Sequence, residues 1–280
     1  MKKILYILPV VYLLFTSCTE RIDIELDDSF TRLVVYGAIT TDTTRHYIEL
    51  STTSSYYYNE APPPVSGASV EISDDVGNTV GLTEVEPGKY ATSPLFFAIP
   101  GRTYTLRIEL AEEINGNSSY MASSSVNAIY PIDSIGLVYQ PDWGEKGFYE
   151  VTCYYQDRPT TDFYMFNIFK NGEMLTDTIS NRFVSEDEFY NGSYTNGIGV
   201  GYLDQSKERE LLRIGDMITF QGCNISKEYY NFVVTLQAET SFQTPLFSGP
   251  PANVIGNISN GAIGFFAAYS VAYSSKVFQP

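Results

Sequence analysis

Short segments of alternating polar and apolar residues recur along most of this chain, and they limit what it can fold into. Residues 32–37, 47–51 and 68–72 are examples. A period of two places the apolar side chains on one face of a β-strand. Sequences that favour tight turns occur at residues 74–78 and at Asn171-Gly172. The sequence therefore predicts an all-β fold whose strands are joined by short turns.

The composition supports this prediction. Of the 280 residues, 44% are hydrophobic, which is enough for a packed core. The chain contains 23 Tyr but a single Trp, Trp143. Tyrosine suits strands with one wet face, because its ring is apolar and its hydroxyl can reach water.

The chain divides into two predicted tandem β-sandwich domains, residues 30–128 and residues 129–280. In the first, residues 64–72, Gly88-Lys89-Tyr90 and residues 100–108 resemble the transthyretin-like or carboxypeptidase-regulatory-like sandwich. That resemblance implies short strands paired through tight turns, with tyrosines packed between two sheets. A change from a Ser/Ala-rich stretch to a Tyr-Pro pair marks the boundary between the domains.

The second domain is predicted to be a larger sandwich with one packed helix at about residues 227–240. Ser226 can cap the start of this helix. Apolar residues recur within it at the helical spacing i, i+3, i+4 and i+7: Tyr229, Phe232, Val233 and Leu236. One face of the helix is therefore expected to pack against a sheet.

The N-terminus predicts export and a lipid anchor. Residues 1–17 form a lipoprotein signal peptide, with two lysines, the apolar run 4–15 and small residues before Cys18. The apolar run is shorter than the roughly 20 residues that span a bilayer. Cys18 is the predicted site of lipid attachment, and the acidic residues 18–29 form a tether. The alternative is an ordinary signal peptide that leaves Cys18 as a spare thiol.

The charge balance excludes some partners. The chain has 17 basic and 33 acidic residues, for a net charge of −16. Such a surface repels phosphate backbones and anionic lipids, so we expect no nucleic-acid partner and no electrostatic attachment to a membrane. The acyl anchor is therefore the expected link to the membrane.

Few residues suggest catalysis or cofactor binding. His46 is the only histidine, and its simplest interpretation is a half-exposed strand residue. Residues 197–201 contain three glycines, but their context fits a flexible hairpin better than a dinucleotide site. Asp187, Glu188 and Asn191 could bind Ca²⁺, although a solvated loop is the favoured interpretation. We expect no catalytic residues, no metal and no cofactor.

Two further groups of residues have open interpretations. Tyr56, Tyr57 and Tyr58 precede a run of prolines and could contact a ligand or a partner, or could fold back on their own sandwich. Cys153 and Cys223 could form a disulfide in an oxidising compartment, or remain two buried thiols. Cys153 is in phase with an inward-facing set, Tyr149, Val151 and Tyr155. Cys223 instead shares its face with the polar residues Thr219 and Gln221, so strand phase argues mildly against the disulfide.

Motifs at both ends of the chain resemble one known family. Cys18 with its acidic spacer is followed by residues 33–40 and 64–70, and the tail contains residues 250–258 and 264–270. Together these motifs resemble outer-membrane lipoproteins of Bacteroidota catalogued as domain of unknown function 4249. The resemblance implies a β-rich lipoprotein, often encoded beside TonB-dependent transporters, and it supplies no catalytic residues.

The expected function is therefore that of a non-enzymatic cell-envelope lipoprotein, accessory to a TonB-dependent outer-membrane barrel, that binds the transporter or its ligand. The cell surface is favoured over the periplasmic leaflet of the outer membrane. A structural or adhesive surface lipoprotein is one alternative. A hydrolase that acts on glycans or peptides through carboxylates is another.

Overall fold

The computed structural model describes residues 31–54, 61–240 and 254–279. Residues 31–280 form one compact unit. Within the described ranges this unit consists of strands in three sheets, together with one α-helix and one short 3₁₀ helix. The structure therefore confirms the predicted all-β sandwich class.

The largest sheet has nine strands in the order β12-β11-β15-β16-β1-β2-β6-β5, and β13 also pairs with β11. In chain order its strands are β1 (Leu33–Thr40), β2 (Tyr47–Thr52), β5 (Thr83–Glu86), β6 (Lys89–Ala91), β11 (Phe163–Lys170), β12 (Glu173–Met174), β13 (Phe183–Glu186), β15 (Met217–Ile225) and β16 (Ile263–Val277).

The remaining described strands form two smaller sheets. The four-stranded sheet has the order β4-β3-β7-β8, and the three-stranded sheet has the order β14-β10-β9. Their strands are β3 (Ser69–Asp74), β4 (Thr79–Gly81), β7 (Thr103–Ile114), β8 (Asn117–Ser125), β9 (Ile132–Gln140), β10 (Phe148–Tyr155) and β14 (Ile198–Asp204).

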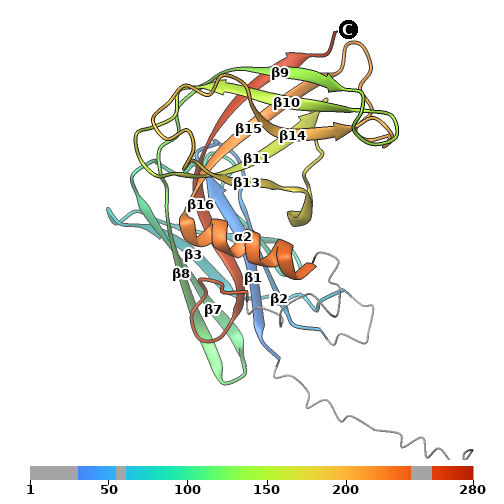
Figure 1. The fold of residues 1–280 in the computed structure, drawn as a ribbon. Coiled ribbons are helices and arrows are strands. Elements are labelled where there is room, and N and C mark those ends of the chain that lie inside the picture. Colours follow the sequence, from blue (N-terminus) through green and yellow to red (C-terminus); the bar gives the residue numbers. More distant parts are fainter. Residues whose placement is uncertain (1–30, 55–60, 241–253, 280) are drawn as a thin grey trace, which may run out of the picture. The chain divides into compact units, whose positions relative to one another are not determined.

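Strand β16 joins the two halves of the chain. Its first part pairs in parallel with β1, from Val34 opposite Ile263 to Thr40 opposite Tyr269. Its second part pairs with β15 in antiparallel fashion. Figure 1 shows β16 as the long red strand between β1 and β15. The predicted boundary between residues 128 and 129 therefore marks a change of small sheet, while the large sheet contains strands from both sides of it.

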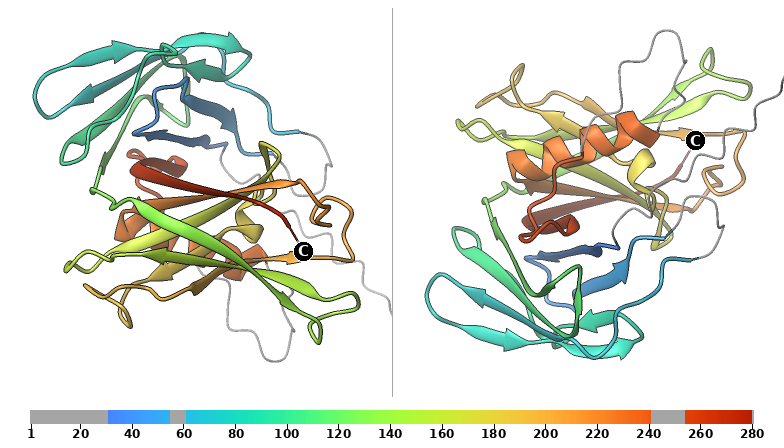
Figure 2. Two further views of the ribbon diagram at one scale, coloured as in Figure 1. Left: turned by 90° about the horizontal axis from the view of Figure 1, so that it is seen from above. Right: turned by 90° about the horizontal axis from the view of Figure 1, so that it is seen from below.

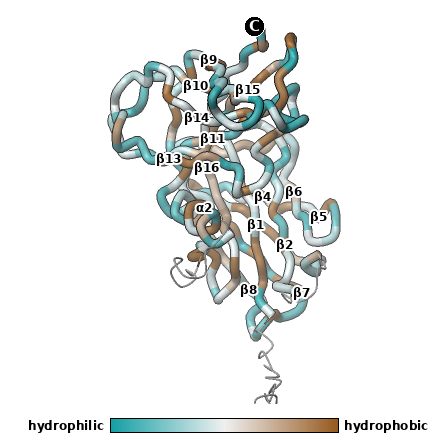
Figure 3. The backbone as a smooth tube through the Cα atoms, turned by 45° about the vertical axis from the view of Figure 1, so that its right-hand side comes forward, coloured by the Kyte–Doolittle hydropathy of each residue, from teal (hydrophilic) through white to brown (hydrophobic). Residues whose placement is uncertain are grey.

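Both small sheets pack on the same face of the large sheet. Even-numbered residues of β16 contribute to the core beneath the four-stranded sheet, which includes Phe266 and Ala268. Even-numbered residues of β15 contribute to the core beneath the three-stranded sheet, which includes Ile218 and Phe220. Phe220 lies opposite Ser274 in the pairing of these two strands, so the two even-numbered sets share one face. Figure 3 shows apolar segments on many strands and polar segments in many of the connecting loops.

The first core follows the predicted alternation. Alternate residues of β1 from Leu33 to Ile39 are buried, including Leu33, Val35 and Ile39, while the residues between them are more exposed. Tyr90 and Tyr104 both belong to this core, as expected for packing between two sheets. The hydroxyl of Tyr90 donates to the carbonyl of Val65 at 3.0 Å, so burial of this ring leaves no polar atom unpaired.

Helix α2 (Lys227–Thr240) covers part of the opposite face of the large sheet, and it matches the predicted range. The Ser226 hydroxyl accepts the backbone N–H of Tyr229 at 3.1 Å, which is the expected N-cap bond. Tyr229, Phe232 and Val233 are buried against strands β11, β15 and β16. Figure 2 shows the helix across the sheet, on the side away from β9 and β10.

The helix is held by polar contacts as well as by its apolar face. The side-chain amide of Gln237 donates to the carbonyls of Ile179 and Arg182, at 2.7 and 2.8 Å. Ile179 begins the short helix η1 (Ile179–Asn181). In the part of the chain that the structure describes, no helix has the length and apolarity needed to cross a membrane.

Candidate functional site

Two of the predicted sites lie outside the described residues. Cys18, with residues 1–17 and the tether 18–29, precedes residue 31, where the described structure begins. Tyr56, Tyr57 and Tyr58 fall in the gap between residues 54 and 61. The lipid attachment and the contact role of these tyrosines therefore stay predictions.

Cys153 and Cys223 are two buried free thiols in the structure, so the alternative of a disulfide between them does not apply. Cys153 belongs to the core beneath the three-stranded sheet. Cys223 belongs to the core beneath helix α2, on the other face of the large sheet. The backbone of the large sheet thus separates the two thiols. Burial raises the pKa of both, to about 12 for Cys153, so neither is a ready nucleophile.

His46 is buried, which corrects the expectation of a half-exposed residue. Only 5% of it is exposed, and its Nε2 lies 3.0 Å from the hydroxyl of Thr40. Its ring packs edge-on against Phe96. Burial lowers the pKa of His46 to about 4, so the imidazole is neutral at pH 7.

The loop at residues 185–188 is not simply solvated, as the sequence had suggested, because Asp187 is fully buried. Glu186 and Glu188 on either side are exposed. Asp187 Oδ2 accepts the backbone N–H of Asp162 at 2.9 Å. Its Oδ1 is buried and has no hydrogen-bond partner. Across the described ranges, no three His, Cys, Asp or Glu side chains are grouped so that they could hold a metal ion.

Asp157 and Asp187 anchor the loop that connects β13 to β14. Asp157 accepts the hydroxyl of Tyr164 at 2.7 Å and the backbone N–H of Gly192 at 3.0 Å. The carbonyl of Asp187 accepts the backbone N–H groups of Tyr190 and Asn191. Burial raises the pKa of both carboxyls. Because each is at most 1% exposed, these acids can hold the loop but cannot touch a substrate in this conformation.

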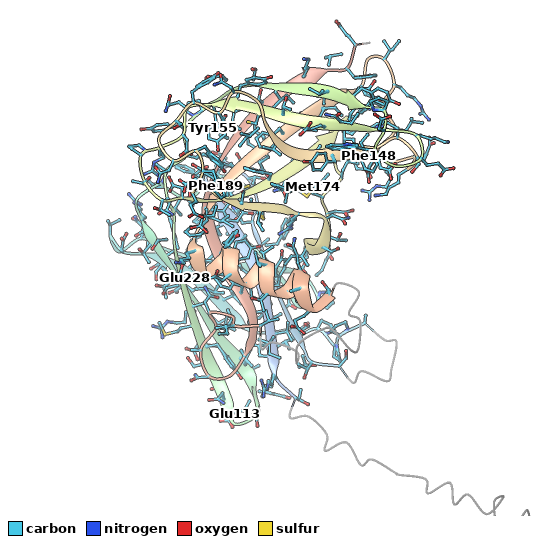
Figure 4. The ribbon with its side chains drawn as sticks, in the orientation of Figure 1. Glu113, Phe148, Tyr155, Met174, Phe189 and Glu228 are labelled. Carbon is cyan, nitrogen blue, oxygen red and sulfur yellow. The ribbon has the colours of Figure 1, made fainter. Side chains whose placement is uncertain are left out.

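The outward face of the three-stranded sheet carries the most distinctive surface of the described structure. On β10 the inward residues Val151 and Cys153 belong to the core, so the residues between them point outward. We call this surface the aromatic face; it comprises outward residues of β10 and β14, with residues of the adjoining loops: Trp143, Phe148, Glu150, Thr152, Tyr154, Tyr194 and Tyr202. Figure 4 labels Phe148 and Tyr155 at the two ends of β10.

Three of its aromatic side chains are well exposed. Trp143, Tyr194 and Tyr202 expose 43%, 44% and 42% of their area. The rings of Trp143 and Tyr202 meet edge to face, with centroids 5.4 Å apart. At the other end, the Asp133 carboxylate raises the pKa of Tyr194 by accepting a hydrogen bond from its hydroxyl. Exposed aromatic groups gathered on one surface indicate a contact site more strongly than scattered ones.

Glycines create room for these rings. Gly197 has a positive φ of 84°, which a residue with a side chain adopts only at a cost. A Cβ at Gly197 would lie 2.7 Å from the hydroxyl oxygen of Tyr154. On the neighbouring strand, a Cβ at Gly136 would meet Thr152 and would lie 3.5 Å from the Tyr154 ring. The Tyr154 ring therefore rests against a part of the sheet that has no side chains.

Sequence reasoning missed this surface. Residues 197–201 had suggested a flexible hairpin, but residues 198–204 form strand β14, which pairs with β10. The outward residues Phe148, Glu150, Thr152 and Tyr154 alternate with apolar inward residues, and this pattern was visible in the sequence. The phase of this strand predicts Tyr149, Val151, Cys153 and Tyr155 as its inward set, and the core confirms that prediction. The sequence did not show that Tyr202, Trp143 and Tyr194 join the outward face of this strand from other segments.

Comparison with known proteins identifies a family but not an activity. The model of the family described as a domain of unknown function (DUF4249) matches residues 19–275. No curated protein matches the chain. The match spans nearly all of the chain after Cys18. This protein therefore belongs to the family of the domain of unknown function DUF4249.

Proposed function

We propose that this protein is a non-enzymatic lipoprotein of the outer membrane that serves a TonB-dependent transporter, by binding the transporter or the ligand that it imports. Cys18 carries the acyl anchor, and residues 19–29 hold the β-rich unit away from the bilayer. The proposed location is the cell surface. The strongly acidic chain, with its net charge of −16, makes lipid insertion and not surface charge the means of attachment.

The aromatic face is the observation that carries the binding role. It is a sheet surface with three exposed aromatic side chains, and in the described part of the structure no element packs over it. Aromatic side chains provide large contact areas and lose little conformational entropy on binding, so they dominate many binding sites. A protein presented on a lipid anchor beside a transporter could use such a surface to hold a ligand or a partner.

The titratable groups support binding over catalysis. The carboxyls with a raised pKa, Asp157 and Asp187, are buried and already hold backbone N–H groups or a tyrosine hydroxyl. The single histidine is buried and neutral. A catalytic acid or base must reach the reacting atoms of a substrate, and none of these three groups can do so in this structure.

The first test is affinity capture of the native protein from its own outer membrane after crosslinking. The expected result is recovery of one TonB-dependent barrel in near-equal amount. The control is Cys18→Ala, which should lose both the acyl group, seen by mass spectrometry, and the barrel. Protease treatment of intact cells reports the leaflet, because a surface protein is digested without lysis.

Recovery of the lipidated protein alone would contradict the transporter role and favour the structural or adhesive alternative. If the protein were exported without an acyl group, the proposed lipid anchor at Cys18 would be wrong. Turnover of a glycan or peptide that is lost on replacing one exposed acid would contradict the non-enzymatic assignment.

A further inference from the structure

The aromatic face has the features of a surface for one chemical class of ligand. Its exposed rings can pack against the C–H faces of sugar rings, and the Tyr hydroxyls and the Trp N–H can bond to sugar hydroxyls. Trp143 and Tyr202 lie at one end of the face, while Tyr154 and Tyr194 lie at the other. The aromatic groups are therefore spread along β10 and do not form one compact patch.

The length of the face fits several sugar units. Phe148 and Tyr154 are six residues apart on β10, which corresponds to about 20 Å of extended strand. This distance is much longer than a single sugar ring, so only a chain of several sugar units could span it. An isolated monosaccharide would contact only one end of the face. The spacing thus favours a chain over a single sugar.

The middle of the face offers hydrogen-bonding groups for sugar hydroxyls. Glu150 Oε2 accepts the side-chain amide of Gln140 at 2.9 Å, which orients the carboxylate. Its Oε1 receives no hydrogen bond from any described residue. A bound sugar hydroxyl could donate to this free oxygen of Glu150.

The charge of the aromatic face favours neutral sugar chains over acidic ones. Strands β9, β10 and β14 contain no Lys or Arg, while Asp133, Glu150 and Asp204 are acidic. The whole chain carries a net charge of −16. Sulfated or uronic-acid polymers would be repelled by this surface, whereas neutral sugars meet no such barrier.

We infer that the aromatic face binds a neutral glycan chain, with several sugar units lying along β10 between Tyr154 and the Trp143–Tyr202 pair. This inference builds on the proposed ligand-binding function and names the class of ligand. It requires neither a transporter nor an anchor, so it can fail while the transporter role stands, and the reverse is also true.

The single tryptophan makes the test specific to this surface. Because Trp143 is the only Trp, its fluorescence reports on the face alone. The purified lipidated protein, in a detergent without a sugar head group, is titrated with cello-, malto-, laminari- and mannohexaose, and with oligogalacturonate. Calorimetry measures the same binding independently. We expect at least one neutral hexasaccharide to change the emission and oligogalacturonate to have no effect.

Two variants and one matched control locate the site. Tyr202→Ala and Tyr154→Ala should each weaken binding by about tenfold or more. Tyr47→Ala should leave binding unchanged, because Tyr47 is as exposed as Tyr202, at 40%, but lies on β2. Circular dichroism confirms that each variant is folded. Since Tyr202 is exposed, its variant keeps the test decisive if Tyr154→Ala does not fold.

Three results would overturn the inference. The first is that no neutral hexasaccharide binds. The second is that binding is undiminished in both aromatic-face variants, or is equally weakened in Tyr47→Ala. The third is a preference for oligogalacturonate, which would contradict the argument from charge.

Discussion

The two small sheets pack on the same face of one large sheet, yet their outer surfaces differ in chemistry. On the four-stranded sheet, hydroxyl side chains pair across β7 and β8: Thr103 with Ser125 at 2.8 Å, and Thr105 with Ser123 at 3.0 Å. On the three-stranded sheet, the corresponding outward positions carry aromatic residues and glycines, together with Glu150 and Thr152. The first surface satisfies its own polar groups, whereas the second exposes rings.

Under the proposed function, this difference separates a surface with a structural role from a surface that binds. Paired hydroxyls are a low-cost way to cover a wet sheet face, because each group has a partner. Exposed rings bring no comparable benefit to the folded chain, so a contact with another molecule is the better explanation for them. Figure 4 shows the two regions apart, with Glu113 at the tip of the β7–β8 hairpin and Phe148 at one end of β10.

The largest effects are expected on the inner faces, where the two sheets should behave alike. Phe220→Ala removes a fully buried ring beneath the three-stranded sheet, and Leu106→Ala removes a buried side chain beneath the four-stranded sheet. We expect losses in the free energy of unfolding of about 3–5 and 2–5 kcal/mol. Urea unfolding followed by circular dichroism measures both. A loss below about 1 kcal/mol in either variant would mean that the two cores are not equivalent.

Acid should destabilise the first half through His46. Its pKa is about 4 in the folded protein and about 6.5 in an unfolded chain, so the unfolded state binds more protons in this range. Stability should fall by about 3 kcal/mol as the pH drops from 7 to 4. His46→Gln should remove this dependence. Urea unfolding at three pH values measures it, and an NMR titration of the single histidine with a pKa near 6.5 would refute it.

For the buried acids of the second half, the pH dependence of stability has the opposite sign. Burial raises the pKa of Asp157 and Asp187 above the value in an unfolded chain. Their neutral forms contribute stability that is complete below the unfolded pKa and is lost as the pH rises through the folded pKa. The two halves therefore contain groups whose pH dependences oppose each other.

The next largest difference in stability is expected when a glycine in each region is replaced by alanine. Gly197 and Gly101 both have a positive φ, 84° and 86°, so alanine at either costs about 1–2 kcal/mol in stability. Only Gly197 lies against a ring, because a Cβ at Gly101 would meet nothing within 4 Å. We expect Gly197→Ala to cost about 1–2 kcal/mol more. If thermal unfolding showed equal losses of stability in the two variants, the contact of residue 197 with Tyr154 would have no effect on stability.

The smallest effect is expected at the paired hydroxyls. Thr105→Ala should change stability by no more than about 0.5 kcal/mol, because the side chain is at the surface and its bond to Ser123 is exposed. It should also leave Trp143 fluorescence unchanged. Tyr202→Ala should be equally mild for stability but should weaken ligand binding by about tenfold or more. If the ligand response depended on Thr105, the four-stranded sheet and not the three-stranded sheet would carry the binding surface.

Much of the fold could be predicted from local patterns. The alternation in β1, the helix at residues 227–240 and the inter-sheet positions of Tyr90 and Tyr104 follow from periodicity and capping. The candidate site could not be predicted in the same way. Strand β10 is rich in aromatic residues on both faces, and its neighbour β14 is interrupted by glycines that resemble a turn. The phase of β10 indicates its inner face, but the pairing with β14 and the positions of Trp143 and Tyr194 depend on contacts between distant residues, which no local pattern shows.

By itself, the sequence determined the all-β class, the single helix, the acidic charge and the family. These properties depend on composition, on periods of two or 3.6 residues and on motifs, all of which are local or additive. Only the tertiary structure decided that β16 joins both halves, that Cys153 and Cys223 lie on opposite faces, and that Asp187 is buried. Each of these depends on contacts between residues distant in the chain, and no local period encodes such contacts.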